Sequence, residues 1–449
     1  MHLRLLASDN GAPFPLLRAL EAMSTLESDL LGSGIRVALA SPIDTIVDGA
    51  FNQHADVLAG ADFMFDYNRP GGLNAYLLSN PAGNCGYNLP YAGVAVARQC
   101  ANLGEHTFAH EVGHALSIPH PFLGWEGGQG YDGDTPADFT SPAPRRVTYD
   151  YTYFQDTLIR DTLIVDTALV ELVDRSNCRE AADGFCDTAP DYVASRWTCD
   201  ANGESVRQLD PDSVAFRSDG SLIMSYSDDA CQARFTPEQQ AAMRAFLLDQ
   251  RADWILTGVD TARVLTTVEN LVPDGGTLAA DFVLPFSAPA NADRYYVTVS
   301  ARRSLRSPIV DVVTRTPSVQ LDPADFDAGE EYYYRVYPFN DHSFGAGVSS
   351  TYRFVAPLAS GSTGSTVESA GLSLHPNPVS PGAEVTIASA AAGTRVEFYA
   401  AATGRRAGAA TIRANRTATL PAGMPTGVYV VRAVSPSRRS QRLGRLAVR

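Results

Sequence analysis

This sequence of 449 residues lacks long apolar runs, lysine and an excess of basic charge. No apolar stretch has the length of a transmembrane helix, so we expect no membrane-spanning segment. Arginine takes the place of lysine throughout the chain, and this bias does not point to any one functional site. The formal net charge of -15 and the pI of about 4.9 argue against a nucleic-acid partner, because phosphate binding depends on clustered basic residues.

Cysteine is scarce, and no signal peptide is recognisable. The start, from Met1 to Asp9, is too short and too quickly polar for one, so we expect the residues shown to begin after processing. The six cysteines form an even set without a C-x-x-C pair, which is typical of disulfides in an oxidising compartment; buried free thiols in a cytosolic enzyme are the alternative. The sequence alone allows fifteen pairings of Cys85, Cys100, Cys178, Cys186, Cys199 and Cys231.

The length predicts about three domains, each able to bury its own core. Residues 1–257 alternate strand-like and helix-like segments, which favours an α/β (α+β) domain with a mixed sheet. A pattern that recurs every five residues from Asp156 predicts a long hairpin. In this domain we expect strands at 2–8, 36–40, 73–78 and 93–97, and helices at 13–31, 105–116 and 237–250.

The rest of the chain predicts two all-β sandwich domains joined by a linker. In residues 258–357, alternating strands at 295–299, 309–313 and 332–337 predict a β-sandwich. Its tyrosine-rich strand and the following Asn340 resemble a fibronectin type III module. Residues 358–370 are rich in Ser and Gly, which predicts a flexible linker, and residues 371–449 form the last unit, nearly free of acids and rich in arginine.

The segment from His106 to His120 carries the chemistry. On a helix, His110 and His114 are one turn apart and present two imidazoles to one ion. Glu111 lies beside them, where its carboxylate can reach a metal-bound water without coordinating the metal. Zinc lowers the pKa of such a water and polarises a carbonyl, and the carboxylate takes the proton and passes it to the leaving amine. The spacing therefore predicts one catalytic Zn²⁺ with Glu111 as general base.

A third protein ligand is needed, because catalytic zinc normally keeps three and an open position. His120 is the candidate, since a histidine at that offset has odds of roughly one in fifty by chance in so histidine-poor a chain. The alternative is a zinc hydrolase that uses a distant glutamate. In that case His120→Ala would leave zinc binding and activity intact.

These residues resemble the zinc signature of the metzincin peptidases, and the likeness extends over about residues 3–254. Met224 corresponds to the Met-turn methionine, and the stretches 223–227 and 186–190 are similar to the pappalysin-like branch. The resemblance implies a twisted mixed sheet with an active-site helix. It also implies that Met224 forms a hydrophobic floor beneath the imidazoles and that the Tyr226 hydroxyl donates a hydrogen bond to the oxyanion.

Two positions depart from the metzincin pattern. Ser117 stands where metzincins usually have a glycine that turns the chain towards the third histidine, and serine tolerates the left-handed conformation less well. The shape of that turn is therefore left open. Ala230 stands where arginine-preferring relatives have an acidic residue, so an arginine preference does not carry over.

The same resemblance implies bridges from Cys178 to Cys199 and from Cys186 to Cys231. That leaves Cys85 with Cys100, around the strand at 93–97. We hypothesise that this strand lines the cleft and that a peptide substrate adds to its edge in extended form.

An Asp-rich loop with Asp132 and Asp134 offers oxygen ligands that a Ca²⁺ ion prefers. Solvated loops of this composition are commoner than calcium sites, so both interpretations stay open.

The end of the chain resembles the C-terminal sorting domain of type IX secretion. The pattern consists of Pro-Asn-Pro at 376–378, an aromatic strand at 396–399 and Gly-Val-Tyr at 427–429 before a last basic strand. It implies the type IX secretion machinery as a partner and an address outside a Gram-negative cell, secreted or attached to the surface. A generic immunoglobulin-like module is the alternative.

Together these features predict a secreted zinc endopeptidase that acts on protein or peptide substrates, and we expect a monomer. The alternative from a different class is a surface adhesin whose peptidase domain is inactive and whose sandwiches bind.

Overall fold

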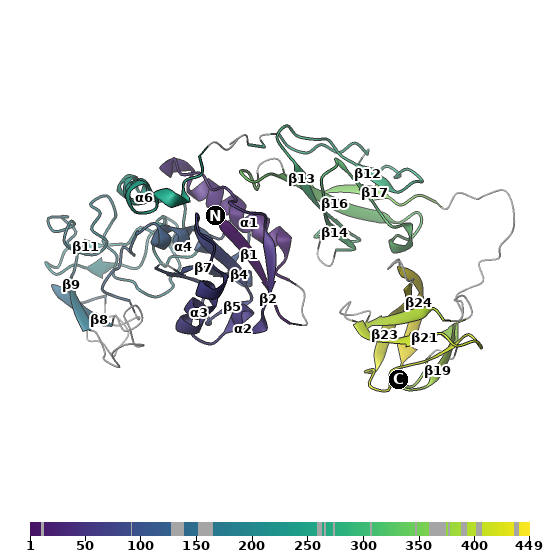
Figure 1. The fold of residues 1–449 in the computed structure, drawn as a ribbon. Helices are drawn as coiled ribbons and strands as arrows, with labels where there is room; N and C mark the ends of the chain where they lie inside the picture. Colours follow the sequence, from purple (N-terminus) through teal and green to yellow (C-terminus); the bar gives the residue numbers. More distant parts are fainter. Residues whose placement is uncertain are drawn as a thin grey trace.

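The computed structural model describes residues 1–9, 13–90, 92–126, 139–150, 165–257, 263–264, 266–272, 274–305, 308–345, 348–358, 374–375, 378–387, 393–400, 406–434 and 440–449. Within these ranges a mixed α/β unit precedes two units built of β-strands (Figure 1). The multidomain architecture predicted from the sequence is therefore present.

A five-stranded sheet forms the centre of the first unit. It consists of β1 (His2–Ala7), β2 (Asp44–Val47), β4 (Asn74–Leu78), β6 (Gly86–Leu89) and β7 (Gly93–Ala97) in the order β2-β1-β4-β7-β6. Four of the strands run parallel, namely β1, β2, β4 and β7, and β6 runs antiparallel to β7. In this order β6 is an edge strand.

Helices cover both faces of this sheet. One face carries α1 (Leu16–Asp29) and α4 (Thr107–Ala115), and the other carries α2 (Gly49–Asn52) and α3 (Val57–Tyr67). Leu77 and Val96 pack in the core beneath α1 and α4, whereas Tyr76 and Ala95 pack beneath α2 and α3. Successive strand residues thus point to opposite faces, and burial on both faces explains why these strands are apolar throughout.

Local capping decides where the helices begin. The helix α6 (Pro237–Gln250) has the predicted bounds, because Thr236 and Gln239 form a capping box around Pro237 in the first turn. The helix α1 begins at Leu16, directly after Pro15 and three residues later than predicted. The helix α3 was not predicted; Asp56 caps it by accepting a hydrogen bond from the backbone of Ala59.

Two sequence-based expectations about the sheet are wrong. Residues 36–40 form no strand, because their backbone pairs elsewhere: Leu39 N–H donates to the carbonyl of Asp341, and Ala40 N–H donates to that of Met1. The strand β7 has no free edge for a peptide, because β4 and β6 pair with its two sides. Among the described strands β2 and β6 form the edges of this sheet, and β6 is the edge strand next to β7.

The remaining elements of the first unit are short. The strands β8 (Arg146–Asp150) and β9 (Val165–Leu169) pair antiparallel, as the predicted hairpin requires. The five-residue pattern begins at Asp156, and its residues 156–164 lie outside the described residues, as do Asp132 and Asp134. The other short elements are β3 (Gln53–His54), β5 (Asn80–Pro81), β10 (Gln208–Leu209), β11 (Ala215–Phe216), η1 (Leu31–Ser33), η2 (Arg98–Cys100) and η3 (Ala252–Trp254).

The second and third units each contain two sheets around a separate core. The second has β14 (Val310–Thr314), β13 (Arg294–Ser300), β16 (Glu331–Phe339) and β17 (Tyr352–Val355) in one sheet and β12 (Val283–Pro285) and β15 (Ser318–Gln320) in the other, with η4 (Pro323–Asp325). The third has β21 (Arg406–Thr411), β20 (Arg395–Ala400), β23 (Gly427–Val434) and β24 (Ser440–Val448) in one sheet and β18 (Leu374–His375), β19 (Glu384–Ile387) and β22 (Thr417–Thr419) in the other. The predicted linker residues 359–370 lie outside the described residues.

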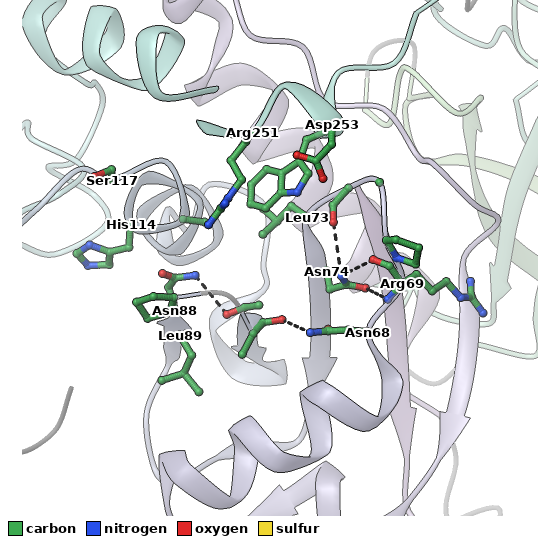
Figure 2. A pocket seen from close by; sticks show the side chains of 18 of the residues that line it. Asn68, Arg69, Leu73, Asn74, Asn88, Leu89, His114, Ser117, Arg251 and Asp253 are labelled. Carbon is green, nitrogen blue, oxygen red and sulfur yellow. Dashed lines mark hydrogen bonds between the residues drawn. The ribbon is translucent and has the colours of Figure 1, made fainter. Parts of the chain in front are cut away.

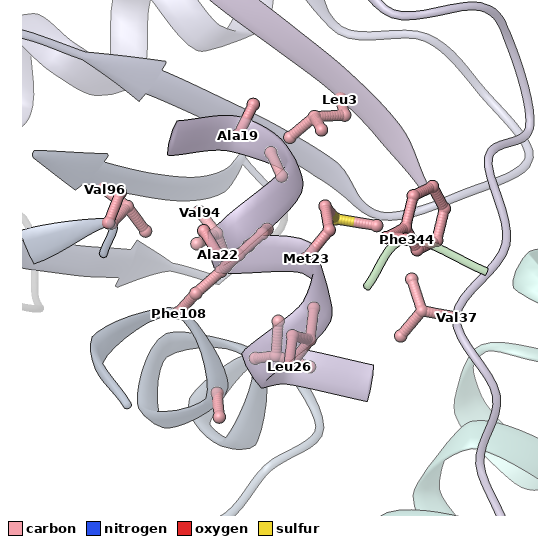
Figure 3. Packing of buried hydrophobic residues seen from close by; sticks show 14 of the residues in the cluster. Leu3, Ala19, Ala22, Met23, Leu26, Val37, Val94, Val96, Phe108 and Phe344 are labelled. Atoms are coloured by element: carbon pink, nitrogen blue, oxygen red, sulfur yellow. The ribbon is translucent and has the colours of Figure 1, made fainter. Parts of the chain in front are cut away.

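The second unit packs directly on α1. Phe344 is buried in the same apolar cluster as Met23 of α1 and Val37 (Figure 3). The backbone N–H of Phe344 donates to Glu27, which also pairs with Arg263 at 2.5 Å. One apolar cluster thus joins α1 to the second unit, apart from that unit's own core.

No helix in the part of the chain that the structure describes is long and apolar enough to cross a membrane. All six cysteines form disulfides, which is compatible with an oxidising compartment.

Candidate metal centre

Three imidazoles meet at the end of α4. The Nε2 atoms of His110, His114 and His120 lie 3.0 to 3.1 Å from one another. Three nitrogens at tetrahedral positions around a zinc ion would be about 3.3 Å apart, given Zn–N distances of about 2.0 to 2.1 Å. Among the described residues, these three form the group whose ligand atoms could hold a metal ion, so His120 joins the two helical histidines as predicted.

Hydrogen bonds on the far side of each ring orient these nitrogens. His110 Nδ1 lies 2.8 Å from the carbonyl oxygen of Ile223, and His114 Nδ1 lies 2.8 Å from that of Ile118. A carbonyl can only accept, so both Nδ1 atoms carry the proton and both Nε2 atoms keep their lone pair. This is the arrangement that metal-bound histidines adopt, and the donor set fits one Zn²⁺ ion.

Burial keeps these rings neutral. It lowers the pKa of His110 to about 4, against the smaller opposing effect of the hydrogen bond to Ile223. Burial also lowers the pKa values of His114 and His120, and the neighbouring imidazoles lower them further. All three rings are therefore unprotonated near neutral pH, which is the state that can bind a cation.

A left-handed turn at Ser117 brings His120 back to the helix. Ser117 has φ of 69°, its N–H donates to the carbonyl of His114, and the N–H of Ile118 donates to that of Gly113. These two bonds are those of a Schellman motif with serine in place of the usual glycine. The missing glycine therefore does not prevent the turn.

Glu111 lies on the buried side of α4 against the edge strand. Burial raises the pKa of Glu111 to about 8, although the backbone N–H of Asn88 on β6 donates to its carboxylate. A Cβ atom on Gly86 would lie 2.9 Å from both Cγ and Oε1 of Glu111. Gly86 thus leaves the space that this carboxylate occupies.

Met224 packs against α4 at Gly113. A Cβ atom on Gly113 would lie 2.5 Å from the sulfur of Met224, which is fully buried. The preceding residue, Ile223, supplies the carbonyl that orients His110. The Met224 segment therefore supports the helix through both packing and a hydrogen bond.

Tyr226 lies beside the triad. Its ring centroid is 5.0 Å from that of His120 and 5.8 Å from that of His110. Burial raises the pKa of the Tyr226 hydroxyl, and the charge of Glu111 raises it further. The hydroxyl therefore stays protonated and can donate a hydrogen bond.

Three residues that shape this centre were not predicted from the sequence. Glu126 Oε1 lies 3.3 Å from His120 Nδ1, and Phe122 stacks on the His120 ring with centroids 4.4 Å apart. Gly86 makes room for Glu111. No periodicity singles out Glu126 or Phe122, and Gly86 lies on a strand that was not predicted.

A cavity of about 490 Å³ opens beside the triad (Figure 2). His114 and Asn88 lie at one end, and Asn74 and Arg69 lie at the other. Leu89 of β6 also lines it. The cavity thus touches both a histidine of the triad and the edge strand.

The disulfide pairing differs from the expectation for two of the three bridges. Cys85 pairs with Cys100 as expected, but Cys178 pairs with Cys186 and Cys199 pairs with Cys231. The crossed pairing of Cys178 with Cys199 and of Cys186 with Cys231 is therefore wrong.

Two local backbone arrangements explain the observed bridges. Turns at 175–184 fold the segment between Cys178 and Cys186 back on itself. The Arg175 side chain also donates a hydrogen bond of 2.7 Å to the carbonyl of Cys186. Trp197 lies alongside the Met224 segment, because its N–H donates to the carbonyl of Tyr226 and its carbonyl accepts from Asp228. That pairing brings the chain just after Trp197 to Cys231.

Asp229, near the position discussed for an arginine preference, is engaged in the structure. One of its oxygens accepts a hydrogen bond from the backbone of His106 at the start of α4, and the other pairs with Arg196 at 2.5 Å. This residue therefore has a structural role at the helix N-terminus.

Neither a family model nor a curated protein matches the sequence. Weak similarities to solved structures include SGBP-B of the Bacteroides ovatus mixed-linkage glucan utilization locus in complex with a heptasaccharide (14% identity, 43% of this chain and 46% of that chain, TM-score 0.19). They also include extracellular domains 3–5 of Drosophila OTK (13%, 41% and 67%, 0.15) and the FN1–FN3 domains of chicken CNTN1 (12%, 41% and 67%, 0.14). This chain thus spans about half the length of the first, and similarities at such TM-scores give no information about the metal centre.

Proposed function

We propose that this protein is a zinc-dependent endopeptidase of the metzincin type that hydrolyses peptide bonds in proteins or peptides. The observation that carries the proposal is the convergence of the three Nε2 atoms, each on a ring whose Nδ1 has a hydrogen-bond acceptor. The sequence spacing of His110, Glu111 and His114 on one helix supports it further. The convergence of His120 with the two helical histidines favours it over a distant glutamate as the third ligand.

The residues around the triad divide the work of hydrolysis. A bound Zn²⁺ ion supplies Lewis-acid activation of a water molecule and of the scissile carbonyl. Glu111 acts as general base: the positive charge of a bound cation would lower its raised pKa, so that its carboxylate can take a proton from the attacking water and deliver it to the nitrogen of the leaving amine. Tyr226, with its hydroxyl protonated, donates a hydrogen bond to the oxygen that gains negative charge.

The edge strand β6 can bind the substrate by pairing with its backbone. An extended peptide that pairs with its free edge gains backbone hydrogen bonds that do not depend on side chains. The same strand carries Gly86 and Asn88, which contact Glu111, so a peptide bound there lies next to the catalytic carboxylate. The adjoining cavity provides room for substrate side chains on one side of the metal centre.

The accessory units suggest an extracellular enzyme. The pattern at the end of the sequence supports a type IX sorting role for the third unit, and the tyrosine-rich β16 supports a fibronectin type III module as the second. The three disulfides are compatible with secretion. On this basis we infer a secreted or surface-attached enzyme of a Gram-negative bacterium.

A digest of casein by wild type and by Glu111→Gln tests the activity. Removal of a general base costs about 10²- to 10⁴-fold in rate, so Glu111→Gln should lose nearly all cleavage while its zinc content remains one per chain. Glu105→Gln is the matched control, since Glu105 precedes α4 and contacts Asn102 rather than the triad. It should cleave at the wild-type rate.

The outcomes separate the rival functions. An adhesin with an inactive peptidase domain would show no cleavage in any sample, including wild type. A hydrolase with a different third ligand would retain zinc and activity in His120→Ala. Cleavage that persists in Glu111→Gln would overturn the assignment of the base.

A further inference from the structure

We propose that Glu126 is a positioning residue for His120 and that it sets the affinity of the centre for zinc. This inference rests on the metal-binding part of the proposed function. The three histidines are oriented in two different ways: the Nδ1 atoms of His110 and His114 face backbone carbonyls, whereas Nδ1 of His120 faces the carboxylate of Glu126 at 3.3 Å. His120 is thus the ligand whose orientation depends on a side chain.

His120 needs such a partner more than the other two ligands do. His110 and His114 are fixed by α4, which presents both rings from consecutive turns. His120 follows the turn at Ser117 and lies on no helix or strand. Its ring direction therefore depends on the contacts of the ring itself.

The chain after His120 folds into a tight turn that returns a carboxylate to the ring. Leu123 N–H donates to the carbonyl of His120, and Trp125 N–H donates to that of Phe122. Phe122 stacks nearly parallel to the imidazole, at an interplanar angle of 14°. Six residues after His120, the carboxylate of Glu126 thereby reaches the edge of the ring that faces away from the other two histidines.

Glu126 is itself held in place. Its second oxygen, Oε2, accepts a hydrogen bond of 2.6 Å from the backbone N–H of Gly124. A Cβ atom on Gly124 would lie 2.8 Å from Ala168 and 2.9 Å from Val147, so the turn fits closely against the β8–β9 hairpin. The carboxylate is therefore fixed on one side by the turn and presents its other oxygen to His120.

This geometry has a chemical consequence. A carboxylate that accepts the Nδ1–H bond fixes the tautomer with a free lone pair on Nε2, and its negative charge makes that nitrogen a better donor to a cation. Loss of such a partner typically weakens metal binding by about 10- to 100-fold. Glu126 acts through His120 and is distinct from the general base.

The test measures zinc affinity by competition with a chromogenic chelator, using the full chain. We expect Glu126→Ala to bind zinc about 10- to 100-fold more weakly than wild type, and Glu126→Gln, which keeps a neutral acceptor, to fall between the two. Glu204→Ala is the matched control, because that carboxylate pairs at the surface with Arg217. Its affinity should equal that of wild type.

A second readout separates positioning from a general loss of structure. In the Co²⁺-loaded protein, each ligating histidine gives one strongly shifted exchangeable Nδ1–H proton signal. Glu126→Ala should broaden or remove one of the three signals. The melting temperature of metal-free Glu126→Ala should equal that of the metal-free Glu204→Ala control. If Glu126→Ala fails to fold, Glu126→Gln carries the test.

The inference is overturned if Glu126→Ala, or Glu126→Gln in its place, binds zinc within twofold of wild type. It is also overturned if all three signals persist unchanged. Failure of wild type to bind zinc would instead refute the proposed function, so the two failures are distinguishable.

Discussion

The contact between Gly113 and Met224 gives a quantitative test of how the metal centre is supported. A Cβ atom at position 113 would lie 2.5 Å from the Met224 sulfur and 3.2 Å from a ring carbon of Phe235. The first distance is about 1 Å shorter than ordinary contact, so either the sulfur or the helix must move. Gly113→Ala should therefore destabilise the α/β unit even though alanine favours a helix.

The expected magnitude combines two opposing effects. Overpacking in a core costs about 1–3 kcal/mol, and so deep an overlap belongs near the upper end. Replacing a helical glycine by alanine gains about 1 kcal/mol, which leaves a net cost of about 2 kcal/mol for Gly113→Ala in wild type. In Met224→Ala the sulfur is gone, and the same substitution should stabilise the protein by up to about 1 kcal/mol.

A double-mutant cycle on the metal-free protein measures this coupling. We expect an interaction free energy of about 2–3 kcal/mol between positions 113 and 224. It is measured by urea unfolding of the metal-free variants. The transition to analyse is the one that moves to higher urea concentration when zinc is added to the wild type. Met224→Ala alone should cost about 2–5 kcal/mol because it leaves a cavity. The reasoning is refuted if Gly113→Ala changes stability equally, within about 0.5 kcal/mol, in both backgrounds.

Two further predictions concern the ends of α4. Ser117 is exposed and has φ of 69°, a left-handed conformation that glycine adopts with less strain. Ser117→Gly should therefore raise the free energy of unfolding by about 1 kcal/mol, or the melting temperature by about 2–4 °C, and leave zinc affinity unchanged. A lower melting temperature would contradict this strain. Burial disfavours the charged form of His106, but the hydrogen bond and charge of Asp29 at 2.9 Å outweigh it and raise the His106 pKa. The stability from this pair is therefore fully present below about pH 6.5 and lost as pH rises through the raised pKa, so Asp29→Asn should lower the melting temperature more at pH 6 than at pH 9. An equal loss at both pH values would show that the pair does not titrate in this way.

The sequence was most informative where structure depends on neighbours along the chain. The helix at 237–250 has its predicted bounds because the capping residues Thr236 and Gln239 lie within one turn of its start. The strand at 93–97 is equally local, since a short apolar run starts at Gly93 and ends before the polar residues Arg98 and Gln99. The spacing of His110 and His114 needed only the helical period to place two rings on one face.

Contacts between distant segments carried no comparable signal. Nothing in residues 36–40 shows that their backbone would pair with Asp341 of another unit rather than with the sheet. The apolar character of α1 predicted burial, but not that a sandwich with Phe344 would share its core. The disulfide pairing likewise followed from how two loops fold, which the resemblance to a family did not predict correctly.

What the sequence by itself determined is the chemistry of the centre: two histidines and a glutamate on one helix, and a histidine six residues further on. Tertiary structure decided how that chemistry is held. The carbonyl of Ile223, the space at Gly86 and the carboxylate of Glu126 reach the centre through folding. The physical reason is the distance along the sequence over which each effect acts. Helical periodicity and capping act over about four residues. The orientation of a ring depends instead on the atoms that the folded chain places beside it.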